Sequence, residues 1–310
     1  MGDYIQELSR RNFLVVCGGI LGASSTTFCG RKSTPDLTAE SGKTQSMQKG
    51  TVNGTFDQNN PYAGFRMGIQ SWCLREINEI DKVIDIVQAL GLNYIEIAPS
   101  VHLPEESPPE KIRAVVEQFK KAGITIDSSG VHKMVNDEKA CRKIFEYTKE
   151  LGVLAVNVWP SYDALPLVDR LAKEYGIPAA IHNHGPEDNL YAKPEMFREY
   201  LSKTSPRVGL CVDTGHFLRS RVDPLAVIDE FPDRIHGIHI KEMILDEQTA
   251  DWVDIIVGAG ELNLLELFTK LKNIDFSGFC SLEYESDPSN STTALSECLV
   301  EIRKACASLG

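Results

Sequence analysis

From residue 65 onward the sequence alternates eight times between a short apolar run and a longer stretch with helical periodicity. The longer stretches place apolar residues three and four positions apart, as at Ile80, Val83, Ile84 and Val87. The short runs between them have the length of buried strands. The pattern therefore predicts eight strand–helix units. The expected strands cover residues 67–72, 94–98, 125–129, 155–159, 179–182, 208–213, 235–240 and 279–284.

Glycine and proline mark the boundaries of these units. Gly91, Gly123, Gly152 and Gly176 each follow an expected helix and precede an expected strand, where a left-handed C-cap residue belongs. A Pro-Pro pair at 108–109 opens another helix, where a missing N–H is harmless. Eight alternating units predict an α/β fold, a single-domain (β/α)8 TIM barrel over residues 63–310. An open doubly wound sheet is the alternative, but no Gly-x-Gly-x-x-Gly follows the first strand.

The first 62 residues carry targeting and linker signals. The run S-R-R-N-F-L at 9–14 resembles a twin-arginine export signal, and an apolar, Gly-rich run follows it to about residue 28. Residues 1–29 are therefore expected to be a signal segment, and the Ser-, Thr-, Gly- and Gln-rich residues 30–62 a disordered linker. We expect an exported, periplasmic protein, with lipid anchoring at Cys29 left open, and a cytoplasmic one if the signal does not function. No apolar stretch is long enough to span a membrane.

Charge and cysteine usage exclude other classes. The formal net charge of −12 opposes binding to nucleic acid, which depends on phosphate neutralisation by Lys and Arg. The eight cysteines contain no C-x-x-C pair. Six of them lie in apolar strand-like runs or on expected helices, which favours buried free thiols over a disulfide framework. These six are Cys73, Cys211 and Cys280 on strand-like runs and Cys141, Cys298 and Cys306 on helices.

Four consecutive expected strands, the fifth to the eighth, end in residue types that bind metals: His182, Asp213, His239 and Glu283. A barrel has its active site at the C-terminal ends of its strands. Each of these residues follows an apolar one, so strand alternation allows all four to point inward. Each alone has a structural explanation, but four adjacent strands together predict one divalent ion. Two imidazoles and two carboxylates suit Mn²⁺, Co²⁺, Zn²⁺ or Fe²⁺ better than Ca²⁺.

The motifs V-D-T-G-H at 212–216, H-I-K-E at 239–242 and S-L-E-Y-E at 281–285 resemble the xylose isomerase-like TIM-barrel superfamily. Its members include sugar-phosphate isomerases/epimerases, inosose dehydratase, ketose 3-epimerases and endonuclease IV. The resemblance covers about residues 65–308. It implies metal ligands on strands five to eight, and Asp213, His239 and Glu283 match that pattern. The fifth strand has His182 where the family has Glu, which puts the paired-glutamate mechanism of ketose epimerases in question.

The resemblance implies a divalent-metal-dependent sugar isomerase or epimerase that acts through an enediolate intermediate. Glu283 is expected to remove the proton, with Glu96 as a second candidate. The groups expected to polarise the oxygen or return the proton are His184, His216 and Lys241. His216 matches the family's supporting or substrate-binding position. Glu96 and His132 are candidates for sugar hydroxyls and Trp72 for stacking on the sugar, although a structural role is as good an explanation for these three.

Three alternatives stay open. A metal-dependent lyase or hydratase acting on a keto-sugar or keto-glycoside needs only one base, and an exported enzyme meets free rather than phosphorylated sugars. A non-catalytic sugar-binding protein is the second. An endonuclease IV-like activity is opposed by the acidic charge and by the absence of an Asp-x-His after His239. The oligomeric state also stays open, and a homo-oligomer is suggested only by analogy with related barrels, which are often dimers or tetramers. Five of the seven histidines, His236 included, are expected at the ends of strands five to seven.

Overall fold

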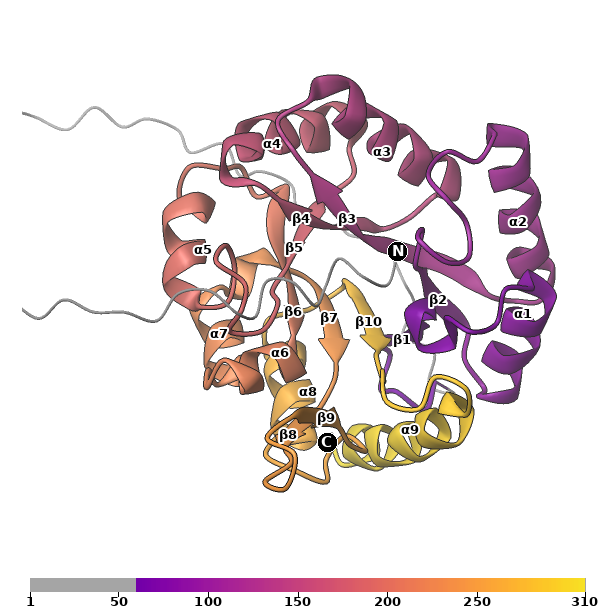
Figure 1. Cartoon of the computed structure of the whole chain (residues 1–310), viewed down its shortest axis with the longest axis vertical. Coiled ribbons are helices and arrows are strands. Elements are labelled where there is room, and N and C mark those ends of the chain that lie inside the picture. Colours follow the sequence, from indigo (N-terminus) through magenta and orange to yellow (C-terminus); the bar gives the residue numbers. More distant parts are fainter. Residues whose placement is uncertain (1–59, 310) are drawn as a thin grey trace, which may run out of the picture. The chain divides into compact units, whose positions relative to one another are not determined.

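Eight parallel strands close into a barrel in the computed structural model, which describes residues 60–309. The strands follow one another around the ring in the order β1-β10-β7-β6-β5-β4-β3-β2 (Figure 1). This confirms the predicted TIM barrel. The barrel strands are β1 (Arg66–Gln70), β2 (Tyr94–Ile97), β3 (Thr125–Met134), β4 (Ala155–Pro160), β5 (Ala179–His182), β6 (Val208–Asp213), β7 (Ile235–Ile240) and β10 (Phe279–Leu282).

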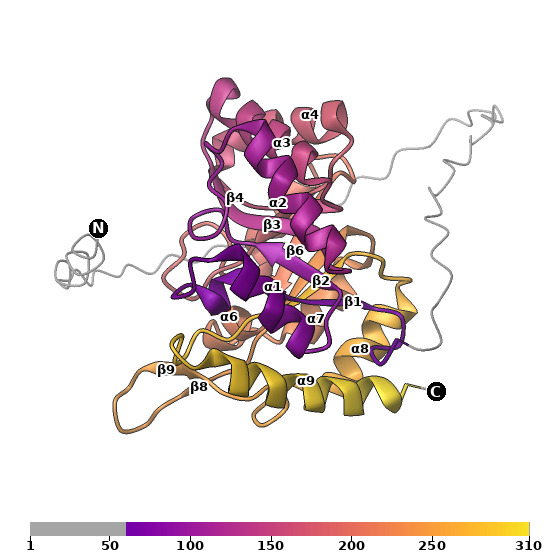
Figure 2. The ribbon, with the colours of Figure 1, turned by 90° about the vertical axis from the view of Figure 1, so that its right-hand side faces the viewer.

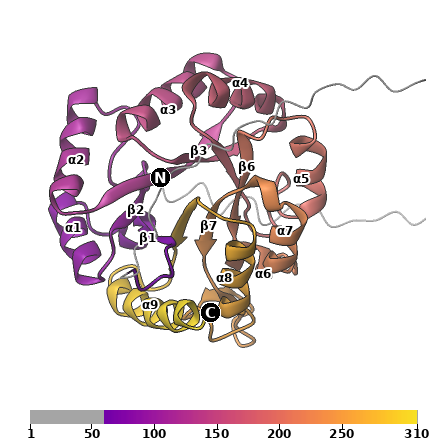
Figure 3. The same cartoon turned by 180° about the vertical axis from the view of Figure 1, so that it is seen from behind.

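The helices form an outer ring around these strands, as Figure 3 shows from behind. Their apolar stripes face the barrel: Val83, Ile84 and Val87 of the first helix are buried. Within residues 60–309 there are nine α-helices rather than the expected eight, because two short helices follow β6. They are α1 (Ile80–Ala89), α2 (Pro109–Lys121), α3 (Glu138–Leu151), α4 (Leu165–Tyr175), α5 (Pro194–Leu201), α6 (Thr214–Arg219), α7 (Pro224–Glu230), α8 (Leu264–Asn273) and α9 (Ser291–Ala307).

The predicted boundary residues have the predicted backbone conformation. Gly91, Gly123, Gly152 and Gly176 have φ values of 71°, 77°, 74° and 73°, in the left-handed region that favours glycine. Gly152 and Gly176 are the C-caps of α3 and α4. Pro109 is the first residue of α2, where proline's missing N–H costs no hydrogen bond.

Three strands end two or more residues away from their predicted ends. The first ends at Gln70, whose side chain accepts a hydrogen bond from the Trp72 N–H and starts a 3-10 turn, η1 (Ser71–Leu74). Cys73 therefore lies in this turn and not in a strand. The third strand continues to Met134, and the last ends at Leu282, so Glu283 directly follows β10. All six cysteines of the described residues are buried free thiols, as predicted.

A small hairpin that the sequence analysis did not predict lies between β7 and α8. It pairs β8 (Met243–Leu245) with β9 (Trp252–Asp254) in antiparallel register. Figure 2 shows it near one end of α9. Its return to the barrel is fixed by the buried Glu242, whose carboxylate accepts hydrogen bonds from the N–H groups of Gly258 (2.5 Å) and Leu262 (2.6 Å). The hairpin becomes part of the candidate site below.

The predicted signal segment, residues 1–29, and most of the predicted linker lie outside the described residues. Asn60 and Tyr62, at the end of that linker, belong to the described unit: Tyr62 is buried, and Arg303 Nη1 donates to its hydroxyl at 3.0 Å. Two more 3-10 turns complete the elements, η2 (Tyr162–Ala164) and η3 (Pro232–Arg234). None of the helices described between residues 60 and 309 is long and apolar enough to cross a membrane.

Candidate metal and substrate site

The interior of the barrel is layered, and its lower layer sets the floor of the site. Small side chains, Ala155, Ala180 and Cys211, surround the ring of Phe279. Gly237 faces the same ring, and any Cβ there would collide with it. Side chains two residues further along a strand point the same way. The next layer toward the C-terminal ends therefore contains His182, Asp213 and His239.

These three residues and Glu283 come together at one point. All four are buried, and one ligand atom from each lies within 4.8 Å of the others. His239 Nδ1 lies 3.1 Å from His182 Nε2 and 2.9 Å from Glu283 Oε2. Asp213 Oδ2 lies 3.6 Å from His182 Nε2 and 3.8 Å from His239 Nδ1. The structure thus brings the four sequence-predicted ligands together.

The donor set fits a divalent transition metal. Bonds of about 2.0–2.2 Å to N and O donors hold neighbouring donors roughly 3.0–3.5 Å apart, close to the spacing seen here. Asp213 caps α6 through Oδ1, which accepts the His216 N–H at 2.7 Å. Its Oδ2 is buried without a hydrogen-bond partner. A bound cation would compensate that carboxylate oxygen, whose burial alone is costly.

Glu96 supports this site from beneath. Its Oε2 lies 2.8 Å from His239 Nε2 and accepts a hydrogen bond from Ser281 Oγ at 2.8 Å. Its Oε1 accepts from Asn157 Nδ2 at 2.9 Å. Carboxylates placed in this way behind a histidine fix its ring and leave the other nitrogen for a metal. The fully buried Glu96 is therefore not in the pocket wall, where contact with sugar hydroxyls was expected.

Lys241 also lies behind the ligands rather than facing the pocket. It is fully buried, with Nζ 3.3 Å from Glu283 Oε2, 3.8 Å from Asp213 Oδ2 and in contact with the Glu285 carboxylate. Burial lowers the pKa of Lys241, but the carboxylates of Glu283, Asp213 and Glu285 outweigh it and raise that pKa well above 10.5. The ammonium therefore stays charged and neutralises part of the cluster.

Burial and neighbouring charges also determine the protonation states of Glu283, His182 and His216. Burial raises the pKa of Glu283, but Lys241 and His239 together bring it well below its usual value, so this carboxylate is ionised. Burial lowers the pKa of His182, as do the neighbouring His239 and His184. Burial also lowers the pKa of His216. Both imidazoles are held neutral, and the neutral form is the one that binds a metal or accepts a proton.

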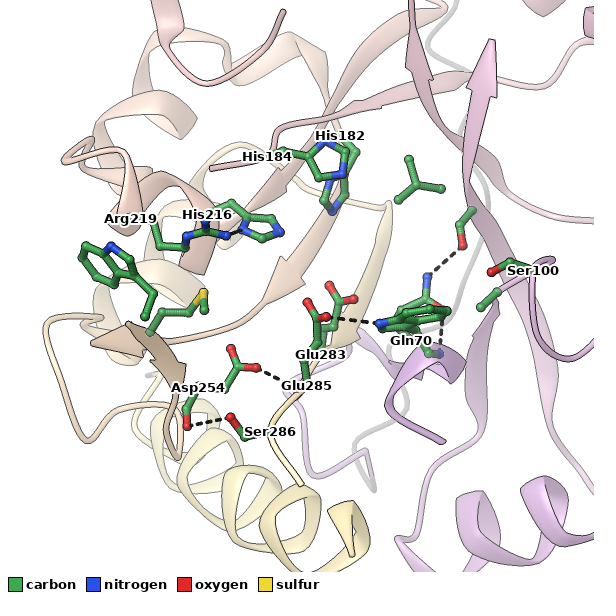
Figure 4. A pocket seen from close by; sticks show the side chains of 16 residues that line it. Gln70, Ser100, His182, His184, His216, Arg219, Asp254, Glu283, Glu285 and Ser286 are labelled. Carbon is green, nitrogen blue, oxygen red and sulfur yellow. Dashed lines mark hydrogen bonds between the residues drawn. The ribbon is translucent and has the colours of Figure 1, made fainter. Parts of the chain in front are cut away.

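A pocket of about 510 Å³ is lined by two of the candidate ligands, His182 and Glu283 (Figure 4). Two of the sequence-predicted substrate residues, Trp72 and His216, line it, together with His184, which was predicted as a catalytic residue. Trp72 Nε1 donates a hydrogen bond to Glu285 Oε2 at 3.1 Å. His132 does not reach it: the buried imidazole lies 3.1 Å from Ser129 Oγ and contacts the Glu105 carboxylate. The roles assigned to these side chains from the sequence stay predictions.

The residues of the pocket wall that sequence reasoning missed include Arg219, Trp252, Asp254 and Glu285. Arg219 Nη2 donates to both carboxylate oxygens of Glu187 at 2.8 Å. Asp254 belongs to the hairpin strand β9. Its Oδ2 accepts a hydrogen bond from the Glu285 N–H at 2.7 Å, while its Oδ1 is buried without a hydrogen-bond partner. Burial raises the pKa of Asp254 to about 6, against the attraction of Lys241. Only Glu285, within S-L-E-Y-E, had a sequence signal.

One histidine was placed at the wrong end. His236 lies near the start of β7, at the opposite end of the barrel from His239. Its Nε2 donates a hydrogen bond to the Pro206 carbonyl at 3.1 Å. Of the five histidines expected around the site, four are there. Two of these, His182 and His184, approach each other with ring centroids 4.8 Å apart.

Comparison with known proteins agrees with this geometry. The family model of the xylose isomerase-like TIM barrel matches residues 137–302. The inosose dehydratase of Geobacillus kaustophilus (strain HTA426) is 26% identical over 281 residues, covering 72% of this chain and 88% of that protein. A solved structure of a putative uncharacterized protein from Parabacteroides distasonis ATCC 8503 is 28% identical, with a TM-score of 0.59 over 76% of this chain and 98% of that one. The E. coli 3-keto-D-glucoside 4-epimerase shares the fold, with a TM-score of 0.60 at 16% identity over 77% of this chain and 99% of that one. The chain belongs to the xylose isomerase-like TIM barrel family.

Proposed function

We propose that the chain is a divalent-metal-dependent enzyme that moves a proton on a carbon next to the carbonyl group of a sugar or sugar derivative, as an isomerase or epimerase. The observation that carries this proposal is the convergence of four buried ligand atoms below an open polar pocket. The unpaired Asp213 Oδ2 within that cluster supports it. The names of the relatives, dehydratases and epimerases, agree with chemistry of this kind.

The roles of the side chains follow from their positions. A divalent ion held by His182, Asp213, His239 and Glu283 would polarise a carbonyl oxygen and acidify the neighbouring C–H bond. Glu283 lines the pocket and is held ionised by Lys241, so its carboxylate is the proton acceptor. His184 stands in the pocket wall with Nδ1 3.6 Å from Asp188 Oδ2, which leaves Nε2 free to return a proton.

A lyase or dehydratase is the second candidate, favoured by one specific observation. The fifth strand supplies the imidazole of His182, so the site lacks the second metal-bound glutamate that a symmetric proton exchange uses. Elimination of water or an alcohol requires only one base and a donor for the departing oxygen. The sequence relatives named inosose dehydratase support this candidate.

The first test is the metal content of the full-length chain beside a His182→Ala variant. We expect about one equivalent of Mn, Co, Zn or Fe in the wild-type chain by elemental analysis, and a loss of this metal in the variant, because a removed ligand leaves the site incomplete. No bound metal, and none taken up when Mn²⁺ or Zn²⁺ is added, would refute the proposal. The non-catalytic sugar-binding alternative would then take its place.

The second test follows keto-sugars and keto-glycosides by NMR in D₂O. Exchange of the α-proton with retention of all substituents identifies an isomerase or epimerase, whereas release of water or an alcohol identifies a lyase. Glu283→Gln should lower turnover by about 100- to 10,000-fold, the usual contribution of a positioned general base. A Glu283→Gln variant that keeps its metal and full turnover would show that Glu283 is not the base.

We also propose that the chain is exported through its twin-arginine segment, which favours free sugars over phosphorylated ones as substrates. The double variant Arg10→Lys, Arg11→Lys keeps the charge but removes the arginine pair. Immunoblots of cell fractions should show the wild-type chain outside the cytoplasm and the variant inside. Equal distribution of the two proteins would reject export by this route.

A further inference from the structure

A second cavity adjoins the metal pocket. It has a volume of about 660 Å³ and is lined by Trp159, His184, Asp188 and Leu190, with the exposed Glu187 and Asn189 at its edge. His184 lines both cavities, so the two spaces are neighbours. Trp159 comes from the end of β4, and the other residues come from the segment that follows β5. No role assigned to the metal pocket uses these residues, apart from His184 and Asp188.

The apolar part of this cavity is held in place by a buried carboxylate. Trp159 Nε1 donates to Asp188 Oδ2 at 3.0 Å, and the Leu190 N–H donates to Asp188 Oδ1 at 2.8 Å. Asp188 is only 8% exposed, whereas Trp159 and Leu190 are half-buried. The indole and the His184 ring form a T-shaped pair, with centroids 5.8 Å apart and planes at 85°. One carboxylate therefore fixes an indole and a leucine that still present surface.

A fixed, partly exposed tryptophan beside a sugar pocket indicates a particular type of ligand. Indole surfaces bind flat apolar faces, such as an aromatic ring or the C–H face of a sugar ring. A preorganised side chain loses little conformational entropy when a ligand packs on it. Cavities of this size are in the range that encloses a small molecule. The polar edge formed by Glu187 and Asn189 can accept hydrogen bonds from hydroxyl groups.

We propose that this second cavity binds the second ring of a glycoside whose first sugar ring occupies the metal pocket. The inference rests on the proposed function, because it takes the metal pocket as the site of the first ring. It makes the substrate larger than a monosaccharide, with a ring substituent joined through an oxygen. Trp159 and Leu190 are then specificity residues for that substituent and take no part in proton transfer.

The test is isothermal titration calorimetry of the Mn²⁺-loaded full-length chain with methyl β-glucoside, phenyl β-glucoside and cellobiose. Phenyl β-glucoside or cellobiose should bind about 3- to 10-fold more tightly than methyl β-glucoside, as expected for one stacked ring. A preference for the phenyl compound identifies an aromatic substituent, and a preference for cellobiose identifies a second sugar. Trp159→Ala should abolish the preference and leave the affinity for methyl β-glucoside unchanged.

The matched control is Trp72→Ala, which removes the same side chain from the wall of the metal pocket. This variant should weaken all three ligands equally. Asp188→Asn, which loosens the indole without removing it, should reduce the preference in part, and it replaces Trp159→Ala if that variant does not fold. Equal affinities of the wild-type chain for all three ligands would overturn the subsite and leave the proposed function standing. No glycoside bound by a chain that holds its metal would overturn the subsite as well, whereas absence of metal would be the separate failure of the proposed function.

Discussion

His236 and His239 lie three residues apart on the same strand, β7, but their side chains lie in different surroundings. His239 points into the barrel, between the Glu96 carboxylate at 2.8 Å on one side and the other three candidate metal ligands on the other. His236 points away from that interior and donates to the Pro206 carbonyl. Side chains separated by an odd number of positions along a strand point to opposite faces. The three positions between His236 and His239 also place His239 closer to the C-terminal end of the strand.

The surroundings shift the two pKa values in opposite directions. Burial lowers the pKa of His236 to about 4, assisted by the charges of Arg234 and Arg207. Burial also acts to lower the pKa of His239, but the anionic groups around it, including Glu96 and Glu283, raise it well above 6.5. The comparison shows that position in the barrel, and not residue type, decides whether a histidine joins the buried cluster of candidate ligands or packs at the other end. It agrees with the general division of TIM barrels into a catalytic and a stabilising end.

The sharpest test of this comparison is the pair His239→Ala and His236→Ala. We expect His239→Ala to lose its metal and to lower turnover by about 1,000-fold or more, since a bound metal contributes several kcal/mol to such reactions. His236→Ala should keep its metal and its turnover. Elemental analysis and the NMR assay measure both. If the two variants lost metal equally, the division between the two ends of β7 would be wrong.

A smaller effect is expected from Glu96→Gln. The amide keeps the size of the side chain but removes the charge behind His239, so the affinity for the metal should fall by about 10- to 100-fold. Competition with a chelator measures this change. Glu105→Gln is the matched control, because Glu105 contacts the imidazole of His132 away from the ligands. An unchanged metal affinity in Glu96→Gln would mean that Glu96 does not orient the ligand.

The sequence predicts those features that depend on local pattern. The helical stripes, the glycines after helices and the eight apolar runs each follow from contacts within a few residues, and the barrel follows from their number. The convergence of the candidate ligands was also predictable, because strand alternation and the position at a strand end are local properties of His182, Asp213 and His239. Glu283 was found in the same way, although it lies one residue beyond the end of β10.

Features that depend on distant pairs were not predictable. Glu96 and His239 are separated by 143 residues. Only the closed barrel shows that the Glu96 carboxylate lies beneath the His239 ring. The hairpin that supplies Asp254 consists of two three-residue strands, too short for a periodic signal. His236 is the second residue of β7 and therefore lies at the opposite end of the strand from His239, which a count of histidines in the run does not show. The number of residues in a run does not show which side chains will meet across the barrel.

The smallest expected effect concerns acid stability and the other end of β7. His236 has a pKa of about 4 in the folded chain, below the value of about 6.5 expected when unfolded. Between these two pH values the unfolded chain takes up a proton that the folded chain does not, so this residue makes stability fall as pH decreases from about 6.5 to 4. Above that window His236 is neutral in both states and has no such effect. In His236→Gln the amide can still donate to Pro206 but cannot titrate.

The free energy of unfolding should therefore fall by about 1–3 kcal/mol less in His236→Gln than in the wild-type chain across this window. Urea titrations at several pH values measure the difference, and His182 and His216, whose pKa values are also lowered, remain in both proteins and cancel. Parallel curves for the two proteins would show that His236 is protonated as easily in the folded as in the unfolded chain. The contrast with His239 would then rest on the direction of the two side chains alone and not on their charge states.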